Sequence, residues 1–481
     1  MAEEKDIGIT VKKSENISEW YTQVIRKADL IEYTSVSGCL VFRPWSYSIW
    51  EEVKKFFDNH IKKRGIKNAY FPLLIPESLL KKESEHVEGF SPEVAWVNYA
   101  GNTKLNEKLA IRPTSETIMY EAYSKWIRSY RDLPLLLNQW CNVVRWEFAN
   151  PVPFLRTREF LWQEGHTVHA TQKGAEDEVY DILDLYKKVF EEMYAIPVLK
   201  GVKSEKEKFA GALFTTSVEA FLPSGKAIQG ATSHCLGQNF SKVFDIKFID
   251  EDEKIKYGWQ NSWGISTRTI GIMIMIHGDD KGLVLPPKVA PLQAVIVPIY
   301  FKEKGRVMES AEKIKKSLEG DFRIHLDNRE EYTPGSKFNE WEMKGVPVRI
   351  EIGPKDIEKS QVILVRRDTG EKIPVLIKDL NKTLSDILQL IHDNLYSKAK
   401  KSLEDNIVET KDWAEFMQAI KNKKIVYAPW CGDKDCEDWI KDKTGGAKTL
   451  NRPLNSPKRI EEKCPQCGRP AKFWFYFGKS Y

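Results

Sequence analysis

One stretch of the sequence, residues 111–169, constrains the fold more than any other. It contains three apolar runs of strand length, LPLLLNQW, NVVRWEF and EFLWQEGH. An unpaired charge inside a buried strand costs too much free energy to persist without a partner. Because such charges gather at functional sites, we expect these runs to form the floor of a pocket for a charged ligand; a purely structural ion-pair network is the alternative. The charged residues within or beside the runs are Arg145, Glu147, Arg156, Arg158, Glu159 and Glu164.

The composition is that of a globular chain with more than one domain. Its 481 residues are 42% hydrophobic and 30% charged, which is enough for roughly two to four cores. No apolar run reaches the length of a membrane span, and the start MAEEKDIGIT lacks the core of a signal peptide. We therefore expect a cytoplasmic protein with no membrane partner. A net charge of +5 neither indicates nor excludes a local surface for nucleic acid.

The first 287 residues read as an antiparallel sheet surrounded by helices. Apolar residues at helical spacing predict helices over 49–61, 117–130 and 174–195. Pro72 lies inside the run NAYFPLLIP and should restrict that strand to an edge. Parallel βαβ patterns are few, which favours antiparallel pairing. The further runs predicted as strands are AIQGATSHCLG, FDIKFID and TIGIMIMIHG.

The segment PPKVAP, at 286–291, marks a boundary, and beyond it strand-like runs alternate with helical patterns at 307–318 and 338–343. This alternation predicts a small α/β domain, and a helix over 384–399 should connect it to a cysteine-bearing tail. The predicted fold class is α+β: an antiparallel sheet with flanking helices, then an α/β domain, then a small α/β C-terminal domain. The predicted boundaries are 1–287, 288–396 and 397–481.

Four of the seven cysteines gather in the tail as Cys431-x4-Cys436 and Cys464-x2-Cys467. In a cytoplasmic chain such a cluster indicates metal rather than disulfides. The CPQCG segment is typical of Zn²⁺–thiolate sites, and four protein ligands leave no open position, so we expect a structural zinc ion. Four unrelated free thiols are the alternative.

The chain has no nucleophilic-serine, Walker-type or HExxH motif. Cys235 follows His234 on a predicted strand, so the two side chains should point to opposite faces, and a thiol nucleophile activated by His234 is the less favoured alternative. His166 and His169 are too few to bind a metal by themselves. Arginines, by contrast, pair with phosphate oxygens in a bidentate manner and keep their charge. The stretch therefore suits phosphoryl or nucleotidyl transfer, which depends on positioning and charge stabilisation.

Three short segments carry a family resemblance. RGIKNAYFPLLIP, RWE at 145–147 and GISTRTIG at 264–271 resemble motifs 1, 2 and 3 of class II aminoacyl-tRNA synthetases. Together with TSE, LRTREFLWQEGH and QGATSHCLGQNFSK they resemble prolyl-tRNA synthetases of the archaeal/eukaryotic type, over nearly the whole chain. The editing domain that bacterial-type relatives insert between motifs 2 and 3 has no room here, so editing by such a domain is not expected.

The resemblance implies roles for particular residues. Arg145, Arg268 and Glu147 would be the catalytic group. Ser266 stands where relatives can carry threonine, and a hydroxyl remains. The residues implied to bind proline are Thr114, Glu116, Arg145, Trp162, Glu164, His166 and His234. Those implied to bind ATP are Arg145, Glu147, Arg156, Thr157, Phe160, Gln229, Thr232, Ser266 and Arg268.

The resemblance also implies partners: ATP with Mg²⁺, proline, tRNA(Pro) and a second copy of the chain. Segment 289–396 resembles an anticodon-binding domain, in which Lys337, Glu340, Arg349 and Arg366 are candidate tRNA contacts; solvated surface charges are the alternative reading. Tyr481 would fold back towards the catalytic domain, whereas simple core packing is the default for an aromatic tail. Alanine or cysteine would be misactivated, because a few missing methylenes are worth only about 1–3 kcal/mol.

Two rival functions are weighed against this one. A paralogue that activates an amino acid without charging tRNA would not need the anticodon-like domain. A non-catalytic RNA-binding protein of synthetase ancestry would be expected to lack Arg145, Glu147 or Arg268, and all three are present.

Overall fold

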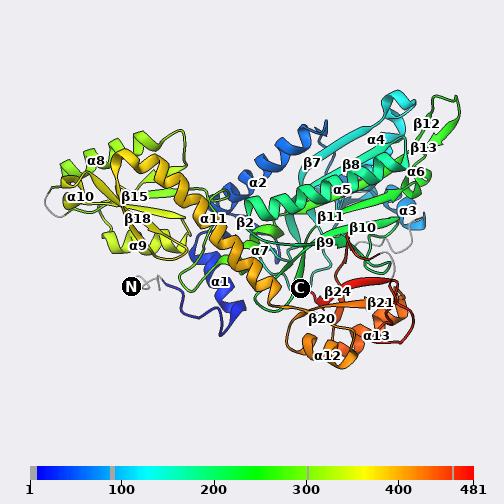
Figure 1. Ribbon diagram of the computed structural model, residues 1–481. Coiled ribbons are helices and arrows are strands. Elements are labelled where there is room, and N and C mark those ends of the chain that lie inside the picture. The colour runs from blue at the N-terminus through cyan, green and yellow to red at the C-terminus, as the bar shows by residue number, and fades with distance from the viewer. Residues whose placement is uncertain (1–7, 87–92, 301–302, 458–459) are drawn as a thin grey trace.

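The computed structural model describes residues 8–86, 93–300, 303–457 and 460–481. Figure 1 shows three groups of elements: a large sheet with its helices, an α/β lobe around β15 and β18, and a small C-terminal lobe around β21 and β24. The long helix α11, Leu380–Glu404, runs from the α/β lobe to the C-terminal lobe.

The large sheet has eight strands and is antiparallel except at one edge, where β3 pairs with β7 in parallel. This confirms the predicted antiparallel sheet. In spatial order the strands are β23 (Arg452–Pro453), β9 (Leu199–Val202), β10 (Phe214–Phe221), β11 (Ala227–Gly237), β14 (Trp259–Ser266), β8 (Glu159–His169), β7 (Leu135–Val144) and β3 (Lys67–Asn68).

Three helices bury one face of this sheet: α2 (Pro44–Lys62), α5 (Gln172–Lys188) and α7 (Arg268–His277); the helix α1 (Ile17–Lys27) contributes to the same core. Alternate strand residues point towards them, as the period of two requires. Trp263 of β14 packs against Phe57 of α2, which stacks on Tyr186 of α5 with ring centroids 5.3 Å apart. The opposite face is left for polar side chains.

Three strand predictions for this region are wrong. The run TIGIMIMIHG, predicted as a strand, forms the helix α7. An unbroken apolar run has no period that separates a strand from a helix buried on every side. The runs LPLLLNQW and NVVRWEF are not separate strands: residues 135–144 form the single strand β7, and Arg145 follows its end.

Pro72 divides the run NAYFPLLIP into β3 and β4 (Leu74–Pro76), so the predicted single strand is also wrong. Pro72 itself lies between the two strands, and both of them are edge strands. The strands β5 (Trp96–Ala100) and β6 (Thr103–Ile111) join β4 in a three-stranded sheet. Two further strand pairs are β1 (Ile31–Tyr33) with β2 (Leu40–Phe42) and β12 (Lys247–Ile249) with β13 (Ile255–Tyr257). The smaller helices of this region include α3 (Glu77–His86), α4 (Glu116–Trp126) and α6 (Asn239–Val243).

The α/β lobe has a mixed five-stranded sheet covered by helices, as the alternating pattern predicts. The strands β16, β15 and β17 are parallel, whereas β18 and β19 are antiparallel to their neighbours. In spatial order the strands are β16 (Ile324–Leu326), β15 (Ala294–Pro298), β17 (Val348–Ile352), β18 (Gln361–Arg366) and β19 (Lys372–Leu376), and the helices are α8 (Lys304–Leu318), α9 (Pro334–Met343) and α10 (Pro354–Glu358).

The C-terminal lobe has a four-stranded sheet and two helices. Its short strand β23 pairs with β9 and so forms one edge of the large sheet. The predicted domain boundaries stay predictions. None of the helices in the described segments is both long and apolar enough to cross a membrane. The elements of the lobe are β20 (Ile407–Glu409), β21 (Ile425–Trp430), β24 (Phe473–Lys479) and β22 (Ala447–Thr449), with α12 (Trp413–Lys421) and α13 (Lys434–Thr444).

Candidate active site

The polar face of the large sheet is built from rows of side chains that lie across neighbouring strands. One row runs Thr215, His234, Ser262 and His166, on β10, β11, β14 and β8. A second row, two residues along each strand, includes Thr232, Gly264, Glu164 and Gln139. Residues two apart on a strand face the same side, so both rows form one floor.

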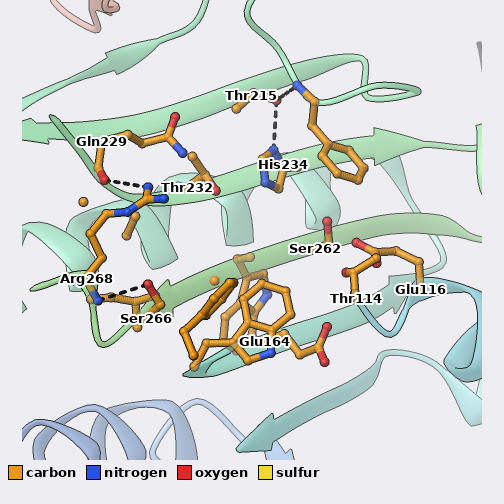
Figure 2. A pocket seen from close by; sticks show the side chains of 18 of the residues that line it. Thr114, Glu116, Glu164, Thr215, Gln229, Thr232, His234, Ser262, Ser266 and Arg268 are labelled. Atoms are coloured by element: carbon orange, nitrogen blue, oxygen red, sulfur yellow. Dashed lines mark hydrogen bonds between the residues drawn. The ribbon is translucent and has the colours of Figure 1, made fainter. Parts of the chain in front are cut away.

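A cavity of about 250 Å³ opens on this floor, and Figure 2 shows its lining. Three residues predicted to bind ATP do not line it: Glu147 and Arg156 are exposed, and Thr157 is buried beside a different, smaller cavity. The other residues predicted to bind proline or ATP all line this one cavity: Thr114, Glu116, Arg145, Phe160, Trp162, Glu164, His166, Gln229, Thr232, His234, Ser266 and Arg268.

Glu164 is the most heavily hydrogen-bonded carboxylate of the cavity. It accepts hydrogen bonds from Ser115, Gln139 and Cys141, and His166 Nε2 lies 3.0 Å from its Oε2. Burial alone would raise the pKa of Glu164, but the hydrogen bonds from His166, Ser115 and Gln139 outweigh it and lower that pKa. Burial likewise works against the charged form of His166, yet the nearby Glu116 and Glu164 raise its pKa. These two residues therefore form a buried ion pair.

Glu116 lies at the same end of the cavity, at the start of α4, and accepts a hydrogen bond from Thr114. Its carboxylate, that of Glu164 and the His166 ring have ligand atoms within 4.8 Å of one another. Glu164 is in hydrogen-bond contact with His166, whereas the charge of Glu116 acts on His166 without a direct hydrogen bond among the described contacts, so Glu116 is a candidate to face a cationic ligand. In Figure 2 Thr114 and Glu116 lie at the end of the pocket opposite Arg268.

Arg145 and Arg268 supply the positive charge. Arg145 Nε donates to Pro113 O over 3.0 Å, and its guanidinium carbon lies 5.4 Å from the Trp162 ring centroid. Arg268 is the first residue of α7, where the helix dipole adds partial positive charge, and it donates to Leu155 O and Gln229 O. Burial, and then the nearby charge of Arg145, lower the pKa of Arg268 to about 10.

No carboxylate of the described segments lies within ion-pair distance of either guanidinium: Arg145 contacts a backbone carbonyl and two aromatic rings, and Arg268 contacts two backbone carbonyls. The charge of Glu219 favours the Arg268 cation, but Glu219 is already paired with Lys203, so the two guanidinium groups form a candidate anion site.

The cavity wall beside His234 includes residues that the sequence did not predict. Thr215 Oγ1 lies 2.9 Å from His234 Nδ1, and the Phe209 ring lies 4.8 Å from the imidazole centroid. Burial, together with the charges of His166 and Arg145, lowers the pKa of His234 to about 3, so the ring is neutral at pH 7. Cys235 does not line the cavity, consistent with its opposite orientation. The alternation of side chains along β10 and β14 could have placed Thr215 and Ser262 on the cavity face. Phe209 lies in a loop, where no such pattern exists.

In the α/β lobe the four residues predicted to contact tRNA are all engaged by the protein. Lys337 is only 4% exposed and donates to Asp327 O over 3.0 Å. Glu340 pairs with Arg329 and Lys344. Arg349 pairs with Glu351 at 2.8 Å, and Arg366 pairs with Asp368 at 2.9 Å. A role for these residues in tRNA binding stays a prediction.

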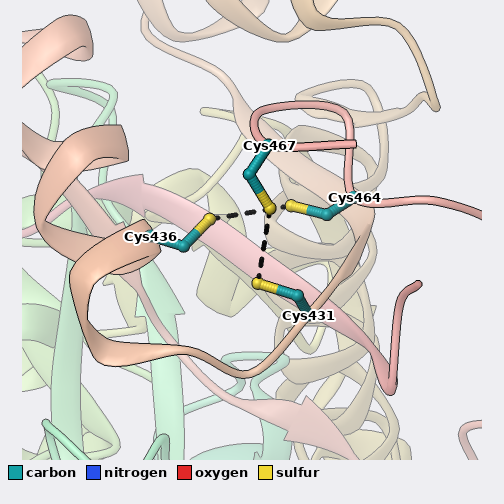
Figure 3. A group of neighbouring side chains, drawn as sticks. All are labelled: Cys431, Cys436, Cys464 and Cys467. Atoms are coloured by element: carbon teal, nitrogen blue, oxygen red, sulfur yellow. Dashed lines mark hydrogen bonds between the residues drawn. The ribbon is translucent and has the colours of Figure 1, made fainter. Parts of the chain in front are cut away.

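The four tail cysteines converge as predicted (Figure 3). Their sulfur atoms all lie within 4.8 Å of one another, and the Cys436–Cys464 and Cys431–Cys467 sulfur pairs are each 3.7 Å apart. A tetrahedron with Zn–S bonds of about 2.3 Å has S···S edges of about 3.8 Å, so this donor set fits a metal ion of that size. Arg469 donates to Cys467 Sγ and pairs with Asp433.

The chain ends against the large sheet. Tyr481 N donates to Ala227 O over 2.9 Å, two residues before Gln229 on β11. The Tyr481 ring packs on the core beneath the sheet, and the Lys226 ammonium lies 5.4 Å from its centroid.

Comparison with known proteins matches three parts of this architecture. Residues 97–277 match the tRNA synthetase class II core domain (G, H, P, S and T), residues 293–387 match an anticodon binding domain, and residues 413–481 match the C-terminal domain of prolyl-tRNA synthetase. The antiparallel sheet, its arginine-lined cavity and the first match together define the catalytic core of a class II aminoacyl-tRNA synthetase.

Close relatives narrow that class. The chain is 53% identical to the cytoplasmic proline–tRNA ligase of Arabidopsis thaliana, over 99% of this chain and 92% of that protein. It is also 53% identical to the proline–tRNA ligase of Natranaerobius thermophilus, over 95% and 94% of the two chains, and 50% identical to that of Alkaliphilus oremlandii, over 97% and 96%. The chain therefore belongs to the prolyl-tRNA synthetase family.

Proposed function

We propose that this protein activates proline with ATP and transfers it to tRNA(Pro). One observation carries the proposal: a single cavity holds Arg145 and Arg268 without a carboxylate partner among the described residues, and holds Glu116 at its other end. An anion and a cation of one substrate complex can therefore bind side by side. Proline supplies a secondary ammonium group, and ATP, which enters as its Mg²⁺ complex, supplies the phosphates.

The first step needs no general base, because the nucleophile is already an anion. A proline carboxylate oxygen attacks the α-phosphorus of ATP, the bond from that phosphorus to the β-phosphate oxygen breaks, and pyrophosphate leaves. Arg145, which lies between Pro113 and the Trp162 ring, would hold the carboxylate and α-phosphate together, and Arg268 would bind phosphate oxygens. Fixed cations at the point where charge develops stabilise the transition state.

The second step uses the product of the first. A terminal ribose hydroxyl of the tRNA attacks the carbonyl carbon of prolyl-adenylate, the bond to the phosphate oxygen breaks, and AMP leaves with the hydroxyl proton. Throughout, Glu116 holds the imino cation. His234 does not repel that cation, because burial keeps its ring neutral.

The test is ATP–pyrophosphate exchange across a panel of amino acids, followed by charging of tRNA(Pro). We expect proline to be strongly preferred. Alanine and cysteine should give weak exchange, because the methylene contacts that they lack lower their binding free energy by only about 1–3 kcal/mol. Equal rates with unrelated amino acids would refute the assignment. Exchange without charging would indicate the amino-acid-activating paralogue instead.

We further propose that the tail cysteines hold one structural Zn²⁺ ion. The four thiolates supply a closed tetrahedral donor set, and the ion would cross-link β21, α13 and the CPQCG loop. Metal analysis should give one zinc per chain. After chelation the C-terminal lobe should become sensitive to protease; unchanged sensitivity would contradict the role.

A homodimer and a cytoplasmic location complete the proposal. Large apolar side chains remain exposed on or beside the three-stranded sheet, and Tyr70 is 72% exposed. Such a group fits an interface with a second copy, and sedimentation should show a dimer at micromolar concentration. The location is carried over from the name of the Arabidopsis relative and is testable by fractionation. The exposed residues are Tyr70, Leu74, Trp96, Tyr99 and Trp126.

A further inference from the structure

One wall of the cavity, beside His234, is formed by the loop of residues 203–213 between β9 and β10. Glu207 and Phe209 of this loop line the cavity. Phe209 packs on His234, and its backbone N–H donates to Thr215 Oγ1 over 2.9 Å. The position of the loop therefore sets the width of the pocket beside His234.

The loop is held from outside by the C-terminal lobe. Lys448, on β22, pairs with Glu207 at 2.5 Å, and Lys206 pairs with Asp438 of α13. Thr449 Oγ1 donates to Ser204 Oγ over 3.0 Å, and both residues are buried. Residues more than 230 positions apart in the chain thus meet at the back of the loop.

The same lobe also holds the strand that leads into the loop. On its side away from β10, β9 is paired by β23, with Arg452 opposite Val202 and Pro453 opposite Gly201. A Cβ on Gly201 would lie 2.1 Å from Arg452 O, so this close approach requires glycine. Asn451 Nδ2 donates to Leu199 O over 2.9 Å.

These contacts differ from ordinary packing between two lobes because they end on a residue of the cavity wall. Lys448 touches Glu207, and Glu207 itself lines the pocket. We propose that the C-terminal lobe is a positioning element for the amino-acid pocket: Lys448 and Thr449 fix loop 203–213 and thereby tighten proline binding. The inference rests on the proposed function, since it assigns the pocket to proline.

The test compares three variants in ATP–pyrophosphate exchange. Lys448→Met keeps the aliphatic stem and removes the charge; we expect KM for proline to rise about three- to tenfold, with KM for ATP and kcat within about twofold of wild type. Lys448→Arg keeps the ion pair and should restore KM. Lys411→Met is the matched control, because Lys411 pairs with Glu462 at 2.9 Å within the tail.

Hydrogen exchange of loop 203–213 gives a readout that does not depend on activity. Lys448→Met should speed exchange in that loop, while Lys411→Met leaves it unchanged. The inference is overturned if Lys448→Met changes neither loop exchange nor KM for proline, or if Lys411→Met raises that KM equally. If wild-type protein shows no proline-dependent exchange, the proposed function fails, and the loop measurement still decides whether Lys448 positions the wall.

Discussion

In the α/β lobe the buried carboxylate of Asp327 accepts hydrogen bonds from Arg329 and Trp341, and Lys337 lies 3.6 Å away. Beside the large sheet, Arg145 contacts a backbone carbonyl and aromatic rings, Arg268 contacts backbone carbonyls, and no carboxylate of the described segments lies within ion-pair distance of either. Only in the first region does the protein place a carboxylate within ion-pair distance of its cations. The contrast separates charges that maintain the fold from charges that await a ligand.

The largest effect is expected where the protein pairs its own charge. Asp327→Asn should lower the free energy of unfolding by about 3–5 kcal/mol, because Arg329 and Lys337 lose their shared partner. Denaturant titration measures the loss. Proline-dependent exchange by the folded fraction should stay at the wild-type rate. A variant as stable as wild type would show that the cluster is not structural.

For Arg268→Ala we expect the opposite outcome, a loss of activity without a loss of stability. Exchange should fall by about 10²–10³-fold, because a fixed charge facing the phosphates is lost. Stability should be retained or increase, since burial and the charge of Arg145 disfavour the Arg268 cation more than Glu219 favours it. Activity measured beside a melting curve separates the two effects. A melting temperature that falls in step with activity would mean that Arg268 is structural.

Within the cavity, Glu116 and Glu164 allow a finer comparison. Glu116→Gln should raise KM for proline by roughly 10–100-fold with little change in stability, because it removes a charge-assisted bond to the ligand. Glu164→Gln should instead destabilise the fold, since it breaks the buried pair with His166. Equal effects of both variants on stability would contradict a ligand-binding role for Glu116 and a structural role for Glu164.

The smallest effect is a pH dependence. The folded-state pKa of His234, about 3, lies below its unfolded value near 6.5, so the unfolded chain binds the proton first as pH falls. Stability should therefore decline from pH 6 to 4.5 by up to about 1.4 kcal/mol per unit from this residue. His234→Asn should flatten the slope but not abolish it, because burial also lowers the pKa of His277, to about 4.

The Asp327 carboxyl provides the internal reference for that experiment. Its pKa is lowered: burial opposes the charged form, but hydrogen bonds from Arg329 and Trp341 outweigh it. Its contribution is present above its unfolded pKa of about 3.9 and is lost only at lower pH. Asp327→Asn should thus leave the slope between pH 6 and 4.5 unchanged. A changed slope of stability against pH would show that protonation in the large sheet depends on Asp327.

The strands and the floor of the site were predictable because side chains alternate along a strand. Trp162, Glu164 and His166 are two apart on β8, and Thr232 and His234 are two apart on β11, so each set faces one side. The helix α7 was not predictable, because an unbroken apolar run gives no period and burial on every side decided its form. The hairpin of β5 and β6 likewise lacked a clear pattern.

By itself the sequence determined which chemistry the chain can carry: fixed cations, carboxylates, a four-thiolate cluster and the alternation that collects them on one sheet face. Only the tertiary structure decided which charges are already paired, because pairing depends on neighbours distant in the chain. It placed Lys337 against Asp327 and left Arg268 beside an open cavity. It also brought Lys448 to Glu207, a contact that no local pattern encodes.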